Sequence, residues 1–283
     1  MQVIKTKDDI KNIITAYKKE NKTIGFVPTM GALHEGHLKL ITEARKENDI
    51  VVLSIFVNPL QFGPNEDFEA YPRSLERDTE LAELTGADIV FAPSAKEMYE
   101  GPPSYTVKVT ERVNVLCGKS REGHFDGVAT VLTKLFNLIR PDRAYFGMKD
   151  AQQVAVIDGL VKEFFFPVHL VPVETIREED GLAKSSRNVY LTEEERKQAP
   201  ILFKSLSNAK ELIENGERNR DVIVEKIKHM IQMQTNGIID YVEVLTYPDL
   251  KEIKELSGNI IIALAVKFTK ARLIDNITIE ITS

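Results

Sequence analysis

The stretch Ile24–Ile41 reads I-G-F-V-P-T-M-G-A-L-H-E-G-H-L-K-L-I, and the fold depends on the change of pattern within it. Its first four residues, 24–27, form a short apolar run that predicts a buried parallel strand ended by Pro28. After a loop centred on Gly31, apolar residues recur at the spacing of an amphipathic helix, at Leu38, Ile41 and Ala44. A strand, a glycine loop and a helix in this order present backbone N–H groups and the positive end of a helix to a phosphate.

Two histidines, His34 and His37, stand where this loop would meet the helix, and their imidazoles could donate hydrogen bonds to the same anion. Gly31 and Gly36 have the spacing of a P-loop, but His37 and Leu38 stand where that motif requires Lys and Ser or Thr. The segment also differs from the zinc motif H-E-x-x-H, because its histidines are three residues apart and no third ligand is evident. We therefore expect no tightly bound transition metal. Taken alone, the pair could also be two surface histidines in a loop.

The segment P-T-M-G-A-L-H-E-G-H strongly resembles the H-x-G-H signature of the adenylate-forming nucleotidyltransferase superfamily. Within that superfamily it resembles the pantothenate synthetase (pantoate–β-alanine ligase) family. The resemblance implies that this stretch binds ATP and that His34 and His37 are catalytic donors to its phosphates. The ATP-binding residues implied here are Met30, Gly31, Ala32, Leu33, His34, Glu35, Gly36 and His37.

The composition is that of a globular protein with a sizeable core: 283 residues, 43% hydrophobic and 28% charged. This length favours two domains. Because no apolar run approaches about 20 residues, we expect no membrane span, and the first residues lack the apolar core of a signal peptide. The single cysteine, Cys117, cannot form an internal disulfide, which makes a cytoplasmic protein the default. The net charge of −6 argues against a general nucleic-acid binder.

The pattern up to residue 176 predicts a Rossmann-like α/β fold, a doubly wound parallel sheet with ligands at the carboxyl ends of its strands. Buried strands are expected over 24–27, 49–57, 87–93, 143–146 and 168–173, with a short extended piece over 105–110. Helices are expected over 8–20, 74–85 and 124–140, besides the helix after Gly36 and one that carries Val154, Ile157, Val161 and Phe165.

Near Ile176 the pattern changes, and we expect two domains, 1–176 and 177–283. The second is a smaller C-terminal α+β domain, which by the resemblance acts as a lid. After a polar loop, Thr192-x-x-Glu195 is a capping box that opens a helix. Pro200 should break or restart that helix, because it has no N–H to donate. Helices are then expected over 201–214 and 221–234, and strands over 239–246, 259–268 and 276–282.

Gln61 follows the expected strand over 49–57, at the edge of the sheet where ligands bind. An amide there can donate to a carboxylate and accept from a hydroxyl. The alternative is a solvent-facing loop glutamine. The run N-P-L-Q-F-G-P-N-E-D-F-x-x-Y-P (58–72) resembles the substrate-binding segment of the family, which implies that Gln61 binds pantoate and later β-alanine.

Gly147, Met148, Lys149 and Asp150 follow a strand and open a helix, so they form a second candidate phosphate loop. Lys149 offers a mobile point charge, and Asp150 could hold the ribose or a magnesium-bound water. The family pattern is G-Q-K-D, from which Met148 departs. The resemblance implies ATP binding by these four residues, a catalytic role for Lys149, and pantoate binding by Gln153.

Lys184, Ser185, Ser186 and Arg187 provide two cations and two hydroxyls, which suit a triphosphate in a loop that closes when substrate is present. The alternative is a solvated linker. The four residues resemble the mobile loop of the superfamily in the form seen in pantothenate synthetases, and this implies ATP binding by all four. By the same resemblance, the backbone of Ile176 meets the adenine.

Two further runs extend the resemblance over nearly the whole chain. R-E-G-H-F-D-G-V (121–128) matches a family motif except at Glu122, where the family has proline, and we expect a structural role for its histidine, His124. L-A-V-K-F-T-K-A-R-L-I-D-N (264–276) matches the C-terminal ending of the family.

The resemblance implies an ATP-dependent ligase that condenses (R)-pantoate with β-alanine to pantothenate. The reaction would pass through pantoyl adenylate and release AMP and pyrophosphate, with Mg2+ on the ATP phosphates. It also implies a homodimer formed through the N-terminal domain. From the net charge and the lack of a long apolar run, we expect no nucleic-acid or membrane partner. Adenylyl transfer to a phosphorylated acceptor is an alternative, but it gives no reason for Gln61 and Gln153. A non-catalytic module that senses ATP is another.

Overall fold

The computed structural model describes residues 1–63, 68–69 and 71–282, and the chain divides into two compact units. The first unit comprises residues 1–113, 118–147 and 156–173, and the second comprises residues 114–117, 148–155 and 174–283. The expected domain boundary at 176 and the lid role of the second part stay predictions.

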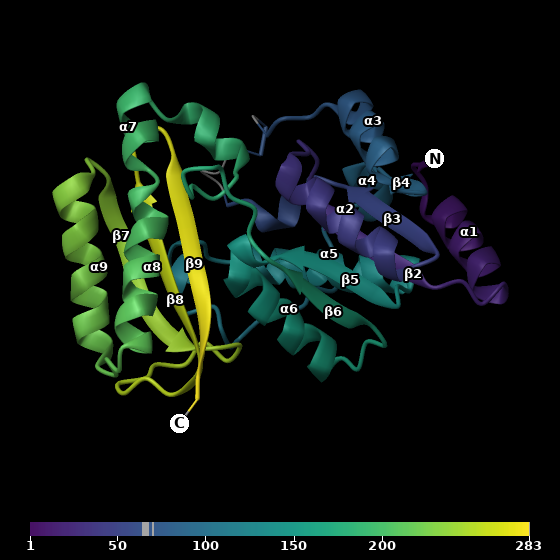
Figure 1. The fold of residues 1–283 in the computed structure, drawn as a ribbon. Helices are drawn as coiled ribbons and strands as arrows, with labels where there is room; N and C mark the ends of the chain where they lie inside the picture. Colours follow the sequence, from purple (N-terminus) through teal and green to yellow (C-terminus); the bar gives the residue numbers. More distant parts are fainter. Residues whose placement is uncertain (64–67, 70, 283) are drawn as a thin grey trace. The chain divides into compact units, whose positions relative to one another are not determined.

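Among the described residues, six parallel strands form the sheet of the first unit, in the order β1-β4-β3-β2-β5-β6 (Figure 1). The strands are β1 (Gln2–Ile4), β2 (Ile24–Thr29), β3 (Ile50–Ile55), β4 (Ile89–Phe91), β5 (Arg143–Gly147) and β6 (His169–Val173). From β2 the chain adds β3 and β4 on one side and later β5 and β6 on the other. The order therefore reverses between β2 and β5, the place where such sheets bind ligands. The predicted doubly wound parallel sheet is confirmed.

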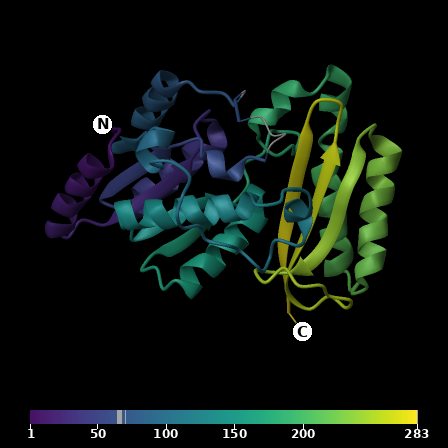
Figure 2. The same ribbon diagram turned by 180° about the vertical axis from the view of Figure 1, so that it is seen from behind.

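Helices cover the two faces of this sheet: α1 (Lys7–Lys19), α2 (Glu35–Glu47), α3 (Leu75–Thr85), α4 (Ala95–Met98), α5 (His124–Ile139) and α6 (Ala151–Glu163). α2 lies on the near side of the sheet in Figure 1, and α5 lies on the near side after the half turn of Figure 2. Successive side chains of a strand point to opposite faces of the sheet, and adjacent residues of β2 show this. Val27 belongs to the core under α2, which includes Ile41, whereas the ring of Phe26 packs edge-on against Phe136 of α5 at 6.3 Å.

Two features of the first unit differ from the expectations, the end of β2 and the presence of β1. β2 continues through Pro28 to Thr29, so the expectation that Pro28 ends the strand is wrong. The described pairing of β2 with β5 covers only residues 25 and 26 of β2. Pro28, which has no N–H to donate, therefore interrupts no hydrogen bond between these two strands. β1 was not expected. The short piece expected over 105–110 belongs to none of the described strands, and its amides at Val107 and Val109 donate to side chains of α5 at 2.9 and 2.8 Å.

The second unit contains an antiparallel sheet, in the described residues β7 (Ile238–Thr246), β8 (Gly258–Lys267) and β9 (Arg272–Ile281) in that order. One face packs against α8 (Ile201–Glu214) and α9 (Arg220–Gln234) in a core that includes Leu206, Ile227 and Ile262. The other face packs against residues from 114–117 and 148–155. The smaller α+β part predicted from the sequence is confirmed. β9 begins four residues before the expected 276, because Arg272 and Asp275 conceal its apolar pattern.

The predicted helix boundaries near Pro200 are confirmed. Thr192 caps α7 (Glu193–Gln198), and the side chain of Glu195 accepts the N–H of Thr192 at 2.9 Å in a capping box. α7 ends at Gln198, and α8 begins directly after Pro200. The proline therefore separates two helices, as a residue without a backbone donor should.

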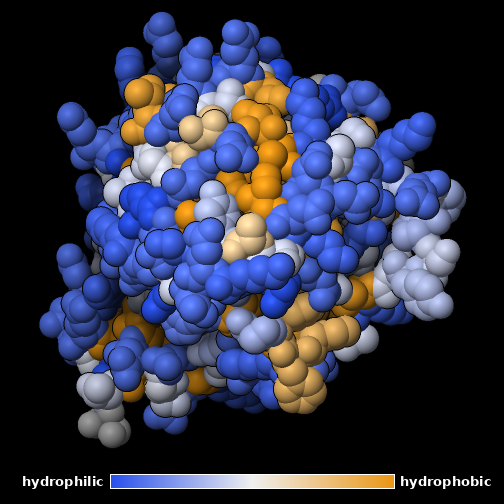
Figure 3. All heavy atoms as spheres, turned by 90° about the vertical axis from the view of Figure 1, so that its right-hand side faces the viewer, coloured by the Kyte–Doolittle hydropathy of each residue, from blue (hydrophilic) through white to orange (hydrophobic). Residues whose placement is uncertain are grey.

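The face of the molecule drawn in Figure 3 is mostly hydrophilic, with a hydrophobic strip near its middle. Exposed large apolar side chains of the first unit include Leu84, Tyr105 and Phe165. Over the described ranges, no helix has both the length and the apolar character needed to cross a membrane.

Candidate active site

His34 and His37 lie one turn apart at the start of α2, and their ring centroids are 4.2 Å apart. His34 is the N-cap residue: its Nδ1 accepts the N–H of Gly36 at 3.1 Å, while Nδ1 of His37 accepts the N–H of His34 at 3.4 Å. A ring nitrogen that accepts from an amide carries no proton, so each neutral ring has its proton on Nε2. The motif therefore provides two Nε2–H donors beside the positive end of α2.

The position between the two histidines, residue 36, needs glycine because the ring of His34 lies over it. A Cβ at position 36 would lie 2.8 Å from Cε1 of His34, closer than such atoms approach in proteins. Any side chain there would displace the imidazole and its cap. The arrangement of the two histidines thus requires glycine at position 36.

The loop between β2 and α2 is held by Asp78 of α3, a residue that the sequence did not single out. Its buried carboxylate accepts the amides of Ala32 and Leu33 at 2.8 and 2.9 Å. The amide of Gly31 donates to Oγ1 of Thr29 at 3.2 Å. The expectation that this loop presents free N–H groups to a phosphate is therefore wrong for these three amides, because each already donates within the protein.

Gly31 allows this approach of the carboxylate. Its φ of 85° lies in the left-handed region, and a Cβ there would lie 2.9 Å from Oδ2 of Asp78. Ala32 follows with a φ of 52°, unusual for a residue with a side chain. Leu33 is buried in the core under α2, so its side chain anchors the loop.

Gln61 ends the short 3-10 helix η1 (Pro59–Gln61), and it is buried, unlike a solvent-facing loop glutamine. Its Oε1 accepts from Nδ2 of Asn58 at 3.3 Å, and its Nε2 donates to Sδ of Met30 at 2.9 Å. The orientation of Asn58 is unambiguous, since its Oδ1 accepts the N–H of Leu60 and its Nδ2 donates to the carbonyl of Gly127. The Nε2–H2 end of Gln61 therefore points away from Asn58, toward Met30.

Two neighbours support this arrangement. The hydroxyl of Tyr99 donates to Oδ1 of Asn58 at 2.9 Å, and burial raises the pKa of Tyr99, so this donor stays protonated. Nδ1 of His124 lies 2.8 Å from the carbonyl oxygen of Gln61, and since a carbonyl accepts, the imidazole donates. His124 thus holds the backbone of Gln61, which agrees with the structural role expected for it. Residues 64–67 and 70 of the matching run lie outside the described residues.

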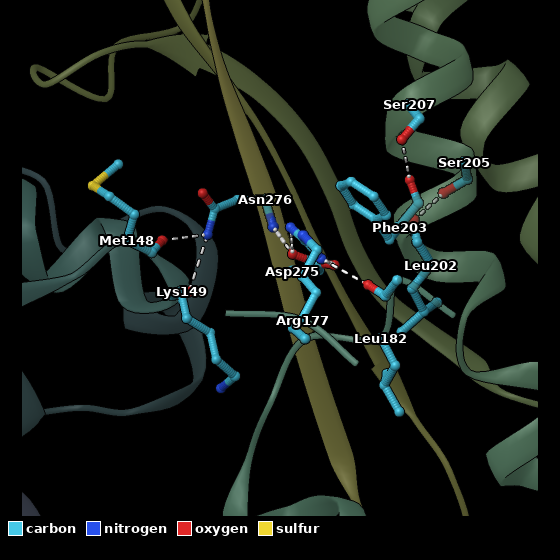
Figure 4. Close-up of polar contacts among 12 residues, drawn as sticks. Met148, Lys149, Arg177, Leu182, Leu202, Phe203, Ser205, Ser207, Asp275 and Asn276 are labelled. Carbon is cyan, nitrogen blue, oxygen red and sulfur yellow. Dashed lines mark hydrogen bonds and ion pairs between the residues drawn. The ribbon is translucent and has the colours of Figure 1, made fainter. Parts of the chain in front are cut away.

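Gly147 ends β5, and the turn that follows is the 3-10 helix η3 (Met148–Asp150). Asn276 of β9 donates from Nδ2 to the carbonyls of Met148 and Lys149 at 2.9 and 3.0 Å (Figure 4). These bonds use the backbone of the turn, so the departure at Met148 from the family pattern leaves them intact. Lys149 is partly buried and Asp150 is exposed.

Two glutamines follow this turn in α6. Gln152 is buried and donates from Nε2 to the carbonyl of Val115 at 2.8 Å, so it is a packing residue. Gln153, the residue expected to bind pantoate, is partly buried. Its substrate role stays a prediction.

The polar loop after Ile176 is a small hairpin in which Arg177 pairs with Ala183 and the carbonyl of Ile176 accepts the amide of Lys184 at 2.9 Å. Nζ of Lys184 lies 3.2 Å from Oε2 of Glu178. Ser185 caps the 3-10 helix η4 (Ser186–Tyr190) by accepting the N–H of Arg187 at 3.2 Å. Ser186 and Arg187 are exposed.

Residues 1–63, 68–69 and 71–282 contain no group of three or more His, Cys, Asp and Glu side chains that could hold a metal ion. Exposed Asp150 is a single carboxylate, which fits a cation that takes most of its ligands from phosphate and water, as Mg2+ does.

The predicted site residues fall into two groups, each with its own scaffold. In the first unit, Met30 contacts Gln61, and the histidine pair follows Met30 in the loop fixed by Asp78. In the second unit, β9 contacts the turn at 148–149 and also binds the hairpin at Arg177. Asp78 gave no signal in the sequence. Asn276 ends the matching run 264–276, and this was the available signal for it.

A doubly wound sheet with a histidine-capped helix at its switch point and a buried amide beside the loop is typical of α/β enzymes that act on phosphate-bearing ligands. The family model described as pantoate-beta-alanine ligase matches residues 2–278. A pantothenate synthetase of Geobacillus sp. (strain WCH70) is 63% identical over 280 residues, 99% of each chain, and that of Bacillus subtilis (strain 168) is 60% identical over 281 residues, 99% of this chain and 98% of the relative. The chain therefore belongs to the pantoate–β-alanine ligase family and is an enzyme of that family.

Solved structures agree with this membership. Pantothenate synthetase from Thermus thermophilus is 42% identical, with a TM-score of 0.91, and covers 98% of this chain and 99% of its own. A pantoate-beta-alanine ligase from Francisella tularensis, complexed with β-γ ATP and β-alanine, is 35% identical, with a TM-score of 0.78, over 98% of this chain and 97% of its own.

Proposed function

We propose that this enzyme condenses (R)-pantoate with β-alanine to pantothenate in two steps, with ATP converted to AMP and pyrophosphate. In the first step a carboxylate oxygen of pantoate bonds to the α-phosphorus, and the bond from that phosphorus to pyrophosphate breaks. In the second step the amine of β-alanine bonds to the acyl carbon of pantoyl adenylate, the bond to AMP breaks, and the amine loses a proton. The Francisella tularensis relative with β-γ ATP and β-alanine supports this choice of substrates.

The observation that carries the proposal is the fixed orientation of the buried Gln61 amide. Its Nε2 donates to Sδ of Met30, a weak acceptor that a carboxylate can replace. Its Oε1 stays beside Asn58. An amide that offers a donor in this way can bind the carboxylate of pantoate and, after the first step, that of β-alanine. Gln153 is the proposed second contact to pantoate.

In the proposed complex, side-chain hydrogen-bond donors that the protein already holds in place face the phosphates of ATP. The Nε2–H groups of His34 and His37 would stabilise the negative charge that grows on the α-phosphate, because fixed donors need no reorganisation at that moment. Lys149 adds a point charge. Lys184 would exchange Glu178 for the triphosphate, and Ser185, Ser186 and Arg187 would follow in the same loop.

Mg2+ would neutralise charge on the β- and γ-phosphates and favour the departure of pyrophosphate. Exposed Asp150 could bind one of its waters. The amine of β-alanine is itself the nucleophile of the second step, so the protein needs to exclude water from the mixed anhydride and to hold the amine against it.

We also propose a homodimer formed through the N-terminal domain, residues 1–176, which the family resemblance implies, and a cytoplasmic location. A sedimentation mass near one 32.0 kDa chain at micromolar concentration would contradict the dimer. Cell fractionation tests the location.

The decisive experiment is pyrophosphate release from MgATP with and without pantoate, in the absence of β-alanine. We expect release that requires pantoate and stops near one equivalent per site until β-alanine is added. Release that needs a phosphorylated acceptor instead would indicate adenylyl transfer. ATP binding without any release would indicate a module that senses ATP.

A further inference from the structure

β9 carries two consecutive buried polar residues, Asp275 and Asn276, whose exposed fractions are 3% and 9%. Neighbouring residues of a strand point to opposite faces of the sheet. Figure 4 shows the result: Asn276 reaches the turn at Met148 and Lys149, and Asp275 reaches Arg177. One strand of the second unit therefore binds two segments that carry proposed ATP ligands, one on each face.

Asn276 uses both protons of its Nδ2 on successive carbonyls, those of Met148 at 2.9 Å and Lys149 at 3.0 Å. Because carbonyls accept, the orientation of the amide is fixed. The two acceptors lie in η3, immediately before α6 begins at Ala151. Their bonds fix the main chain of Lys149, from which its ammonium extends (Figure 4).

Asp275 binds the root of the hairpin. Its carboxylate accepts from both terminal nitrogens of Arg177, at 2.7 and 2.9 Å, and the same guanidinium donates to the carbonyl of Gly181 at 3.1 Å. Arg177 also lies 3.5 Å over the ring of Phe203. A planar guanidinium held by two parallel bonds and an aromatic face has little freedom. The hairpin that precedes Lys184 is therefore anchored to β9.

The two anchors are joined at the strand itself, because Oδ1 of Asp275 also accepts the backbone N–H of Asn276 at 2.8 Å. A displacement of Arg177 would thus also move Asn276, the residue that holds the 148–149 turn. We propose that Asn276 is a positioning residue for Lys149, and that Asp275 with Arg177 positions the hairpin on the same strand. This inference rests on the proposed function.

The test measures the two half-reactions separately in Asn276→Ala. Because Lys149 acts on the phosphate, pantoate-dependent pyrophosphate release should fall by about ten- to a hundredfold, the effect of a misplaced catalytic group. The reaction of supplied pantoyl adenylate with β-alanine should change less than about threefold. Asn259→Ala, the same change at an exposed residue of β8, should leave both half-reactions at the wild-type rate.

A double-mutant cycle with Lys149→Ala gives the second readout. If Asn276 acts through Lys149, its replacement should cost little more once the lysine is absent. Multiplicative losses, a parallel fall of both half-reactions, or wild-type release in Asn276→Ala would each overturn the inference. If Asn276→Ala does not fold, Asn276→Ser takes its place under the same criteria. Wild-type enzyme without pantoate-dependent release would instead refute the proposed function itself.

Discussion

Replacing Asp78 with Asn should loosen the loop that carries the histidine pair. The carboxylate accepts the amides of Ala32 and Leu33 through separate oxygens, at 2.8 and 2.9 Å. Asparagine has the same size but a single acceptor oxygen, so its NH2 group would face one of the two N–H groups. One bond would be lost, and one buried amide would remain without an acceptor.

The magnitude follows from these contacts. A hydrogen bond to a charged acceptor contributes about 1.5–3 kcal/mol, and an unpaired buried amide adds to the loss, so we expect about 2–4 kcal/mol. Ala32 has a φ of 52°. That left-handed conformation costs about 1–2 kcal/mol for a residue with a side chain, which favours opening once a bond is gone. Since about 1.4 kcal/mol is a factor of ten, the loop should open about thirty- to a thousandfold more often.

Amide hydrogen exchange of the 30–34 segment measures this opening directly. We expect faster exchange at Ala32 and Leu33 in Asp78→Asn, together with a higher KM for ATP. Glu80→Gln, which neutralises an exposed carboxylate of the same helix, should change neither. Wild-type protection of these two amides in Asp78→Asn would show that the carboxylate does not hold the loop, and the reasoning would fail.

Three further predictions concern other parts of the molecule. Lys149→Ala should reduce pyrophosphate release by roughly a hundredfold, about 3 kcal/mol, and near-normal turnover would remove Lys149 from the mechanism. Gln61→Ala should raise the KM for pantoate and for β-alanine by roughly ten- to a hundredfold, since about 1–3 kcal/mol is lost when a buried polar partner is missing. The KM for ATP should stay constant, as should every KM in the exposed control Gln232→Ala; a rise for ATP alone would place Gln61 elsewhere. Hydrogen bonds from the amides of Thr192 and Thr269 hold the pKa of Glu195 at about 2, below its ordinary 4.5. Its contribution to stability is complete above about pH 4.5 and is lost as the pH falls toward 2. The thermal unfolding midpoint of Glu195→Gln should therefore depend less on pH between 4.5 and 2 than that of the wild type. Parallel wild-type and mutant curves of midpoint against pH would contradict this.

The fold was predictable where a strand is buried on both faces. The runs over 24–27 and 49–57 are apolar at nearly every position, as central parallel strands are. β9 was placed too late because Arg272 and Asp275 stand in its first half, and their charges are matched by tertiary partners that a local pattern does not contain. β1 has three residues, of which the first two are exposed, so it offered no period to detect.

The site was predictable where a motif is local. The histidine cap depends on residues within one turn, His34, Gly36 and His37, and sequence spacing contains all of it. Asp78 binds amides that are 45 and 46 residues earlier in the chain. In the sequence it is an acidic residue in the first turn of a helix, where it serves the helix dipole equally well. No spacing argument separates these two uses, because only the fold brings α3 to the loop.

Asp78 and Asn276 each fix the backbone of a loop that carries proposed ATP ligands. In the first loop a carboxylate takes backbone N–H groups, and in the turn at 148–149 a carboxamide gives its protons to backbone carbonyls. The amides of Ala32 and Leu33 and the carbonyls of Met148 and Lys149 are thereby bonded to the protein's own side chains. A phosphate bound at the first loop, as proposed, would therefore meet the imidazoles of His34 and His37 rather than these two amides. Backbone nests bind phosphate through amides that point inward, whereas here the amides and carbonyls fix the loops so that the side chains keep one geometry.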